Sequence, residues 1–440
     1  MPEDRYRKVP TGRLSRLSAF GKLAGGIAGG VLAEGARRWA NGERPRISDL
    51  LLTPANAMRV TDQLSKLRGA AMKLGQMISM DAGDVLPVEL TEILARLRDS
   101  AHYMPPAQLN KVLIAEWGAD WRRRFRHFEA TPIAAASIGQ VHRATLPDGT
   151  VLAIKVQYPG VADSIDADVD NVASLLRLSN LLPSTLDIAP LLAEAKKQLR
   201  EEADYVREAG QIRRYGALLA DDPAFLVPAP YAPLSGKRVL AMDFIPGVSI
   251  EKLEGQSREV SNAAMHALLD LVLRELFEFG FMQTDPNFAN YRWQAASGKI
   301  VLLDFGAARP VPAPTVEAYH RLMQAGLDED RDALRDTLIE IGFVSAVTLQ
   351  RHRPALDGMI DVLVAHLGKP GLFNFADRSF IDEVRRHAET IVGDRAAWHI
   401  PPAETLFVQR KVSGTAMLAI KLQAMLPLRE LVQERVASRV

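Results

Sequence analysis

The spacing of apolar residues changes several times along this chain, and each change predicts a different kind of element. From Ser137 to Leu146 and from Thr150 to Tyr158 β-branched residues are frequent, and the turn at residues 147–149 (Pro-Asp-Gly) predicts a β-hairpin. Helical spacing follows over residues 162–216, then a short strand is predicted from Val239 to Phe244. In an earlier segment apolar residues recur at intervals of three and four, which predicts one face of a helix: Val60, Leu64, Leu67, Ala71, Leu74 and Ile78.

These changes of pattern divide the 440 residues into four predicted segments. Residues 1–45 are basic and rich in glycine, and residues 46–125 are helical. Residues 126–248 mix strands with helices, and residues 249–440 are mostly helical. We therefore expect an α+β fold with an N-terminal helical extension. Near the C-terminus the apolar spacing predicts a helix that packs in a bundle through Leu406, Val412, Met417, Ile420 and Leu422.

Composition narrows the possible functions by exclusion. The net charge is +1, so the overall charge does not indicate a nucleic-acid partner, and we expect none. The chain has no cysteine, which excludes disulfides, thiolate nucleophiles and cysteine-rich metal sites. Its hydrophobic content of 48% and charged content of 24% are ordinary for a soluble globular protein.

One apolar run near the N-terminus bears on membrane contact. Leu23 to Ala33 is too short to cross a bilayer, which takes about 20 apolar residues. A basic and amphipathic segment favours an anionic membrane surface, so we expect peripheral contact. A glycine-rich helix that packs on its own protein would explain the same residues, and both interpretations stay open. The basic arm before this run contains Arg5, Arg7, Lys8, Arg13, Arg16 and Lys22.

The strongest chemical signal lies between residues 281 and 306. Asp285 and Asn290 are five residues apart, and Asp304 begins an Asp-Phe-Gly turn after an apolar strand. Phosphoryl transfer from Mg-ATP needs one carboxylate near the attacking hydroxyl and further oxygen ligands for Mg²⁺. Protein kinases supply these groups with an Asp and an Asn at this spacing, followed by the Asp of a D-F-G turn. The pattern therefore predicts a site that uses ATP and Mg²⁺.

Two features that precede this loop in the sequence correspond to the segments with which a kinase binds the phosphates of ATP. Lys155 lies in residues 152–156 (Leu-Ala-Ile-Lys-Val), close to the V-A-I-K strand whose lysine contacts the α- and β-phosphates. A lysine among apolar strand residues is otherwise an ordinary edge residue. In place of the usual glycine-rich loop the chain has Ala134-Ala135-Ala136-Ser137-Ile138-Gly139-Gln140, where only Gly139 easily takes a positive φ. We therefore expect altered nucleotide handling.

Further motifs extend this pattern and carry a resemblance to a known family. They are Lys73-Leu74-Gly75-Gln76, Glu202-Ala203-Asp204 and Gln283-Thr284-Asp285-Pro286-Asn287. With the alanine-rich loop, they resemble the K-x-G-Q, E-x-D and catalytic-loop motifs of the UbiB-type atypical kinases, which serve ubiquinone biosynthesis in bacteria and mitochondria. The likeness covers roughly residues 60 to 430, and the Q-T-D-P-N form is nearer to the mitochondrial ubiquinone-kinase branch.

The resemblance implies roles for the matched residues and a bilobal protein-kinase-like fold, with residues 126–248 as N-lobe and 249–440 as C-lobe. Asp285 is the carboxylate of the catalytic loop, and Asn290 and Asp304 ligate Mg²⁺. Lys155 contacts the phosphates. The residues implied to border the nucleotide are Ala134, Ala135, Ala136, Ser137, Gly139, Lys155, Met242 and Phe244.

Lys155 is implied to pair with a glutamate of the following helix, and Glu202 and Glu208 are the candidates. Six residues apart on one helix, they would be separated by about 600° and would not share a face. We expect Glu208 to be the partner of Lys155. Glu202 and Asp204 then remain for the family motif.

Lys73, Gly75 and Gln76 lie on the helical extension, which in the family folds over the space where a protein kinase accepts a peptide. An amphipathic helix whose Lys and Gln face water is the ordinary explanation of these residues. The chain also reaches a helix-like segment at Thr315 soon after Asp304, with no long activation segment between them. Both features disfavour phosphoryl transfer to protein.

Other candidates receive a structural interpretation. A run of arginines, Arg122, Arg123, Arg124 and Arg126, alternates with Trp121, Phe125 and Phe128. This pattern can indicate a phosphate or membrane surface, but a charged loop before the first strand is the interpretation we favour. We expect His142, on the first strand, to be structural.

The resulting hypothesis is an atypical Mg-ATP-dependent kinase or ATPase that supports ubiquinone biosynthesis. We expect transfer to a small molecule, a lipid or water, with ubiquinone precursors and enzymes of the pathway as partners. The expected location is cytoplasmic, peripheral at the inner membrane surface. The alternatives are a pseudokinase scaffold that binds nucleotide, or a small-molecule kinase like those that modify aminoglycosides, which would not explain Lys73 to Gln76.

Overall fold

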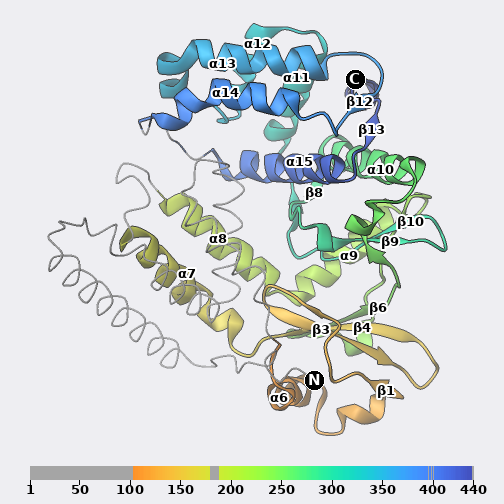
Figure 1. The fold of residues 1–440 in the computed structure, drawn as a ribbon. Helices are drawn as coiled ribbons and strands as arrows, with labels where there is room; N and C mark the ends of the chain where they lie inside the picture. Colours follow the sequence, from red (N-terminus) through yellow and green to blue (C-terminus); the bar gives the residue numbers. More distant parts are fainter. Residues whose placement is uncertain (1–102, 179–187, 395, 398, 400, 439–440) are drawn as a thin grey trace, which may run out of the picture. The chain divides into compact units, whose positions relative to one another are not determined.

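The structure is a computed structural model that describes residues 103–178, 188–394, 396–397, 399 and 401–438 (Figure 1). The lead 1–45, the Lys73 to Gln76 motif and most of the predicted extension lie outside these residues. The chain forms two compact units. The first consists of the chain up to Gly210 together with a second segment, Ala229–Phe244. The second consists of Gln211–Pro228 together with Ile245–Val440. Residues 211–228 thus pack with the second unit, although they fall inside the predicted segment 126–248.

The first unit is built on a five-stranded antiparallel sheet. β3 (Gly139–Thr145) and β4 (Val151–Gln157) form the predicted hairpin, and β6 (Val239–Asp243) pairs with the other edge of β4. Two short strands, β1 (His127–Phe128) and β2 (Ala134–Ala135), pair with β3. Alternate side chains of β4 fill the core, as expected of a strand with period two: Leu152, Ile154 and Val156.

The helices of the first unit confirm the helical prediction for the described part of residues 162–216. They are α6 (Pro106–Trp117), η3 (Trp121–Arg124), α7 (Val161–Leu178), α8 (Ala189–Glu202), η4 (Ala232–Leu234) and α9 (Tyr205–Leu218), whose last residues belong to the second unit. The break between α8 and α9 has a local cause. Asp204 Oδ1 accepts a hydrogen bond from the backbone N–H of Arg207 (2.9 Å) and so caps the first turn of α9.

The arginine-rich segment lies before β1, where we expected a charged loop, but residues 121–124 form the short helix η3 and its aromatic residues pack together. The ring of Trp121 lies 5.0 Å from that of Phe128, and the Arg122 guanidinium lies 4.7 Å from the Trp121 ring. His142 is buried beneath Phe128, and its Nδ1 lies 2.8 Å from the carbonyl oxygen of Glu129. Burial lowers the pKa of His142 to about 4, so the ring is neutral at physiological pH.

The second unit contains small sheets that the sequence predicted only in part. In the four-stranded sheet β10 (Lys299–Leu302), the predicted strand before Asp304, lies between β5 (Phe225–Leu226) and β9 (Tyr291–Gln294), and β7 (Val248–Ser249) pairs with β9. The remaining strands form two antiparallel pairs: β8 (Phe281–Gln283) with β11 (Ala308–Pro310), and β12 (Phe373–Asn374) with β13 (Met425–Leu426).

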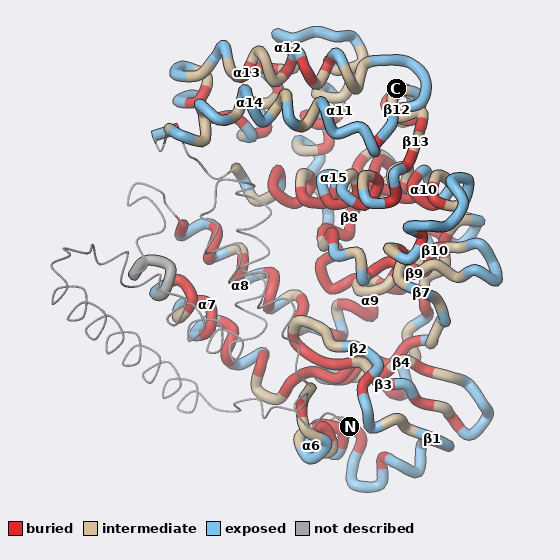
Figure 2. The backbone as a smooth tube through the Cα atoms, viewed as in Figure 1, coloured by how far each residue is buried: buried red, intermediate tan, exposed pale blue. Residues whose placement is uncertain are grey.

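The rest of the second unit is mostly helical, as predicted. Its helices are η5 (Ile250–Leu253), α10 (Arg258–Phe277), η6 (Phe288–Asn290), α11 (Ala313–Leu327), α12 (Arg331–Glu340), α13 (Ala346–Leu367), α14 (Ser379–Gly393), α15 (Ala403–Lys421) and α16 (Leu428–Ala437). α10 and α15 pack together, and Figure 2 shows buried positions along both. None of the described helices is long and apolar enough to cross a bilayer.

The buried face of α15 corrects the face predicted from apolar spacing. Leu406 and Leu422 are buried as expected, but Val412 is 36% and Met417 59% exposed. Arg410 and Lys411 are buried in their place. An apolar count misses Lys411 because segments distant in sequence present polar groups to its ammonium.

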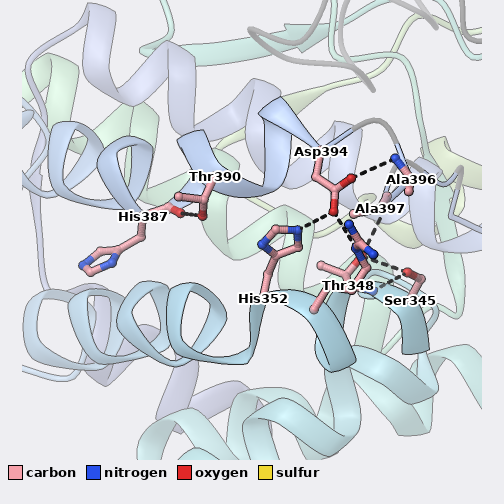
Figure 3. A network of polar contacts seen from close by, with 9 residues as sticks. Ser345, Thr348, His352, His387, Thr390, Asp394, Ala396 and Ala397 are labelled. Atoms are coloured by element: carbon pink, nitrogen blue, oxygen red, sulfur yellow. Dashed lines mark hydrogen bonds and ion pairs between the residues drawn. The ribbon is translucent and has the colours of Figure 1, made fainter.

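α13 is kinked where a proline interrupts its hydrogen bonding. Pro354 lies inside the helix, and His352 has a non-helical conformation with φ −131°. Asp394, just beyond α14, joins the two helices here (Figure 3): its Oδ2 lies 2.8 Å from His352 Nε2 and accepts a hydrogen bond from Arg351 Nε at 2.6 Å. The hydrogen bonds from Arg351 and His352 lower the pKa of Asp394 to about 2.

We predict that Asp394→Asn lowers the melting temperature at pH 7 by a few degrees. Because the pKa of Asp394 is depressed in the folded state, its contribution is present above the unfolded value of about 4 and is lost as the pH falls toward 2. The difference in melting temperature between wild type and variant should therefore shrink from pH 7 to pH 3. Asp336→Asn, at an exposed position of α12, is the matched control. A difference that stays constant with pH would contradict the prediction.

Candidate functional site

Lys155 forms a buried ion pair with Glu208. Its Nζ donates to Oε1 at 2.8 Å and to Oε2 at 3.0 Å, and the two residues are 6% and 0% exposed. β4 supplies the lysine and the first turn of α9 the glutamate, while Nζ also lies 5.3 Å from the ring of Tyr205. The predicted pairing of Lys155 with Glu208 is confirmed.

The two residues of the E-x-D motif have separate contacts. Glu202 Oε2 accepts a hydrogen bond from Ser137 Oγ at 2.7 Å, which joins the end of α8 to the alanine-rich loop. Asp204 caps α9, the helix that carries Glu208. The expectation that Glu202 and Glu208 lie on one helix was wrong, because Asp204 ends one helix and begins the next.

The alanine-rich loop is the turn of a small hairpin in which Ala136 N–H donates to the Gly139 carbonyl oxygen at 2.8 Å. Gly139 does not have a positive φ, so the reason given for glycine at this position was wrong. A Cβ on Gly139 would lie 2.4 Å from the carbonyl oxygen of Val156 and 2.9 Å from the hydroxyl of Tyr205. Glycine is required here because β4 and α9 approach the backbone closely.

Two other residues of the predicted nucleotide set lie at the end of β6. Met242 is buried and pairs in register with Ala153 of β4. The backbone N–H of Phe244 donates to the carbonyl oxygen of Val151 (3.1 Å), and the guanidinium of Arg143 lies 4.9 Å from the Phe244 ring. Contact of these residues with nucleotide stays a prediction.

The second unit brings the catalytic-loop residues together. Asp285 and Asn290 follow β8, and Asn290 Nδ2 donates to Asp285 Oδ2 at 3.3 Å. The backbone N–H of Asn287 donates to the other carboxylate oxygen at 3.4 Å. Asp285 therefore orients the amide of Asn290 so that its Nδ2 faces the carboxylate.

Asp304 is joined to the same loop through the backbone and one side chain. Leu303 N–H donates to the Asn290 carbonyl oxygen at 2.8 Å, and Gln283 Nε2 donates to the Asp304 carbonyl oxygen at 3.1 Å. Asp304 has φ +58°, a left-handed conformation that non-glycine residues seldom adopt, and its Oδ1 accepts a hydrogen bond from Gly306 N–H at 3.1 Å. Such backbone strain is typical of functional sites.

Sequence reasoning missed a buried lysine, Lys411, which contacts residues on both sides of the catalytic loop. Lys411 of α15 is 2% exposed, and its Nζ donates to Tyr291 OH at 2.9 Å and to Gln283 Oε1 at 3.4 Å. Its counter-charge is Glu275 of α10, whose Oε2 lies 3.2 Å away. Lys411 thus contacts the residue two before Asp285 and the residue directly after Asn290. A charged residue inside an apolar helical stretch was the only signal in the sequence.

The Lys411 ammonium and the Glu275 carboxylate each stabilise the charged form of the other. Burial lowers the pKa of Lys411, but the adjacent charge of Glu275 and hydrogen bonds outweigh burial and raise it. Burial raises the pKa of Glu275, and the ammonium of Lys411 together with the Tyr215 hydroxyl opposes this rise; that hydroxyl donates to Glu275 Oε1 at 2.8 Å. We infer a charged ion pair at neutral pH.

The donor set of the second unit fits Mg²⁺, which prefers oxygen ligands and keeps several from water or phosphate. Asn290 and Asp304 provide an amide and a carboxylate oxygen on segments joined by the Leu303–Asn290 hydrogen bond. Within the described residues no cluster of three or more His, Cys, Asp or Glu is placed to hold a metal. Two protein ligands with substrate phosphates are the arrangement that this pair can serve.

Comparison with known proteins agrees with these features. The family described as "ABC1 atypical kinase-like domain" matches residues 96–338. Atypical kinase COQ8, mitochondrial, of Saccharomyces cerevisiae is 37% identical over 98% of this chain and 86% of its own, and atypical kinase COQ8B, mitochondrial, of Rattus norvegicus is 38% identical over 98% and 81%. The structure of Rv3197 of Mycobacterium tuberculosis, in complex with erythromycin, has a TM-score of 0.60 and 26% identity, covering 86% of this chain and 95% of that one. The resemblance drawn from the motifs and the kinase-like α+β fold are thereby confirmed.

We predict that Lys155→Met lowers the free energy of unfolding by about 3–5 kcal/mol, because it removes one member of a buried ion pair. The double variant Lys155→Met/Glu208→Leu should recover much of this loss, because apolar side chains can replace a buried pair. Chemical denaturation of both variants checks the stability, and calorimetry with Mg-ATP checks binding, which neither variant should recover. Additive losses in stability would show that the pair is not coupled.

We predict that Lys411→Met also costs about 3–5 kcal/mol and lowers turnover, because Gln283 and Tyr291 lose their shared donor. Lys421→Met is the matched control on the same helix: Lys421 pairs with Glu251 at the surface, and its loss should cost about 1 kcal/mol or less. Since the pKa of Lys411 is raised, its contribution is fully present below the unfolded value and should hold up to about pH 10. An equal loss of unfolding free energy in the two variants would contradict a role of Lys411 in holding the catalytic loop.

Proposed function

This chain belongs to the ABC1 family of atypical kinases and is a kinase-type phosphotransferase, and we propose that it transfers the γ-phosphoryl group of Mg-ATP to a small molecule, a lipid or water in ubiquinone biosynthesis. The buried Lys155–Glu208 pair carries the proposal, because kinases need this pair in place for transfer. The relatives that bear the COQ8 name and the motif resemblance support the pathway.

The assigned residues have different roles in the proposed reaction. Lys155, held by Glu208, contacts the α- and β-phosphates. Asp285 orients the attacking hydroxyl and accepts its proton, while Asn290 and Asp304 hold Mg²⁺. Bound Mg²⁺ would supply positive charge that offsets the charge developing on the phosphoryl oxygens. Because the chain has all of these residues, we favour an enzyme that turns over ATP, and not a scaffold that only binds nucleotide.

The proposed acceptor is not a protein. α11 begins at Ala313, soon after Asp304, so the described chain has no long activation segment on which a peptide could dock. Ubiquinone precursors are the acceptors we propose, with enzymes of the pathway as partners. We propose a peripheral position at a membrane surface, which rests on the basic lead outside the described residues.

We predict that Asp304→Asn lowers ATP turnover by at least about 100-fold, because a neutral amide holds Mg²⁺ less well than a carboxylate. Calorimetry should show that ATP binding by the variant no longer depends on Mg²⁺. Asp336→Asn provides the matched control at an exposed carboxylate. Turnover that persists in Asp304→Asn would show that the metal assignment is wrong.

We predict that turnover rises in the presence of anionic liposomes and a phenolic mimic of a ubiquinone precursor. Cells that lack the protein should contain less ubiquinone, measured by lipid extraction, and Asp285→Asn should not restore it whereas Asp336→Asn should. Unchanged ubiquinone content would remove the pathway while leaving the kinase fold and family membership intact.

A further inference from the structure

Arg410 of α15 is a buried cation with two guanidinium nitrogens that have no hydrogen-bond partner among the described residues. The residue is 3% exposed, and its Nε and Nη2 are both buried. Among the described residues, none accepts a hydrogen bond from either nitrogen. A guanidinium is always charged in proteins, so it cannot escape the cost of burial by losing a proton.

The two nitrogens form one edge of the guanidinium. Nε–H and Nη2–H point in nearly the same direction, and this fork matches the two oxygens of a carboxylate or phosphoryl group. Arg335 of α12, which is 9% exposed, shows the usual arrangement, because its Nε donates to Asp357 at 2.8 Å and its Nη1 to Asp332 at 2.6 Å. Arg410 therefore differs from Arg335, because both nitrogens on one edge of its guanidinium lack a hydrogen-bond acceptor among the described residues.

The position of Arg410 on α15 places it beside the catalytic segments of the second unit. One turn toward the C-terminus on the same helical face, Gly414 lies so close to the catalytic loop that a Cβ there would be 2.2 Å from Cβ of Pro286, the residue after Asp285. One turn toward the N-terminus, the ring of Phe407 lies 3.9 Å from the guanidinium of Arg309, on the strand after the Asp-Phe-Gly turn.

No neighbouring charge on α15 substitutes for the missing partner. Lys411, the next residue, is itself positive and is matched by Glu275. Arg410 thus carries a positive charge that no ion pair among the described residues matches, on the helix that contacts the loop of Asp285.

We propose that the Nε/Nη2 edge of Arg410 binds an oxyanion, namely a phosphoryl or carboxylate group carried by the acceptor or by the phosphorylated product. The assignment to acceptor or product rests on the proposed function, whereas the binding of an oxyanion does not. Without its ligand, Arg410 destabilises the fold, because an unpaired buried charge is unfavourable. Sites kept for binding commonly carry such a cost in stability.

The test is thermal unfolding of the full chain in chloride, inorganic phosphate or acetate at equal pH and ionic strength. Phosphate should raise the melting temperature of the wild type above its value in chloride, because a ligand of the folded state stabilises it. In Arg410→Met the rise in melting temperature from chloride to phosphate should be smaller than in the wild type. In chloride, the variant should melt at a higher temperature than the wild type. A rise in acetate as large as in phosphate would show that the site accepts carboxylates as well as phosphoryl groups, and a rise in phosphate alone would assign the site to phosphoryl groups.

Three further variants sharpen the test. Arg410→Lys keeps the charge but lacks the fork, so it should retain less than half of the phosphate effect. Lys155→Met removes the lysine assigned to nucleotide phosphates and should leave the Arg410-dependent rise in place. Arg335→Met, which breaks a paired arginine, should lower the melting temperature in chloride.

The proposal is overturned if wild type and Arg410→Met respond equally to both phosphate and acetate, or if Arg410→Met lowers the melting temperature in chloride as Arg335→Met does. Either result would make Arg410 a structural residue satisfied by ordered water. The measurement needs no turnover, so loss of the proposed kinase activity would not produce a false failure.

Discussion

Taking a charged group out of water is costly, and both units of this protein meet the cost with a lysine and a glutamate that face each other. In the first unit, Lys155 and Glu208 join a central strand to the first turn of α9. In the second, Lys411 and Glu275 join α15 to α10 beneath the catalytic loop. Each pair fixes the element that carries a phosphate-binding or catalytic group, so the chemistry depends on charges that the core can tolerate only in pairs.

The polar residues around these pairs have a common task, which is to hold backbone in conformations that it would not otherwise keep. Gln283 accepts a hydrogen bond from Lys411 and donates one to the carbonyl oxygen of Asp304, which has a positive φ. Ser137 and Glu202 hold the alanine-rich loop against α8. In this way the loops that contact substrate in the proposed function are positioned by rigid helices.

Arg410 is informative because it breaks this pattern. A protein that matches Lys155, Lys411 and Arg335 with carboxylates has left one guanidinium fork without a protein partner among the described residues. It lies on the helix that supports the catalytic loop, beyond residues 96–338 that the family match covers. A charge retained against stability at such a place is best explained by a ligand that completes it.

Much of the candidate site could be predicted because its chemistry depends on residue type and short spacing. The hairpin that carries Lys155, the Asp285 and Asn290 loop and the Asp-Phe-Gly turn are local patterns, and the predicted elements around them are confirmed. The choice of Glu208 over Glu202 was also right, although the reason was wrong, because the two lie on separate helices.

The remaining features depend on contacts between segments far apart in the chain. Lys411 meets Gln283 and Tyr291 across more than a hundred residues, and Gly139 is required by Val156 and Tyr205, which periodicity cannot reveal. Residue types and local spacing thus established the family and the candidate chemistry. Long-range packing established which buried charges are matched, because burial and pairing exist only once distant elements meet.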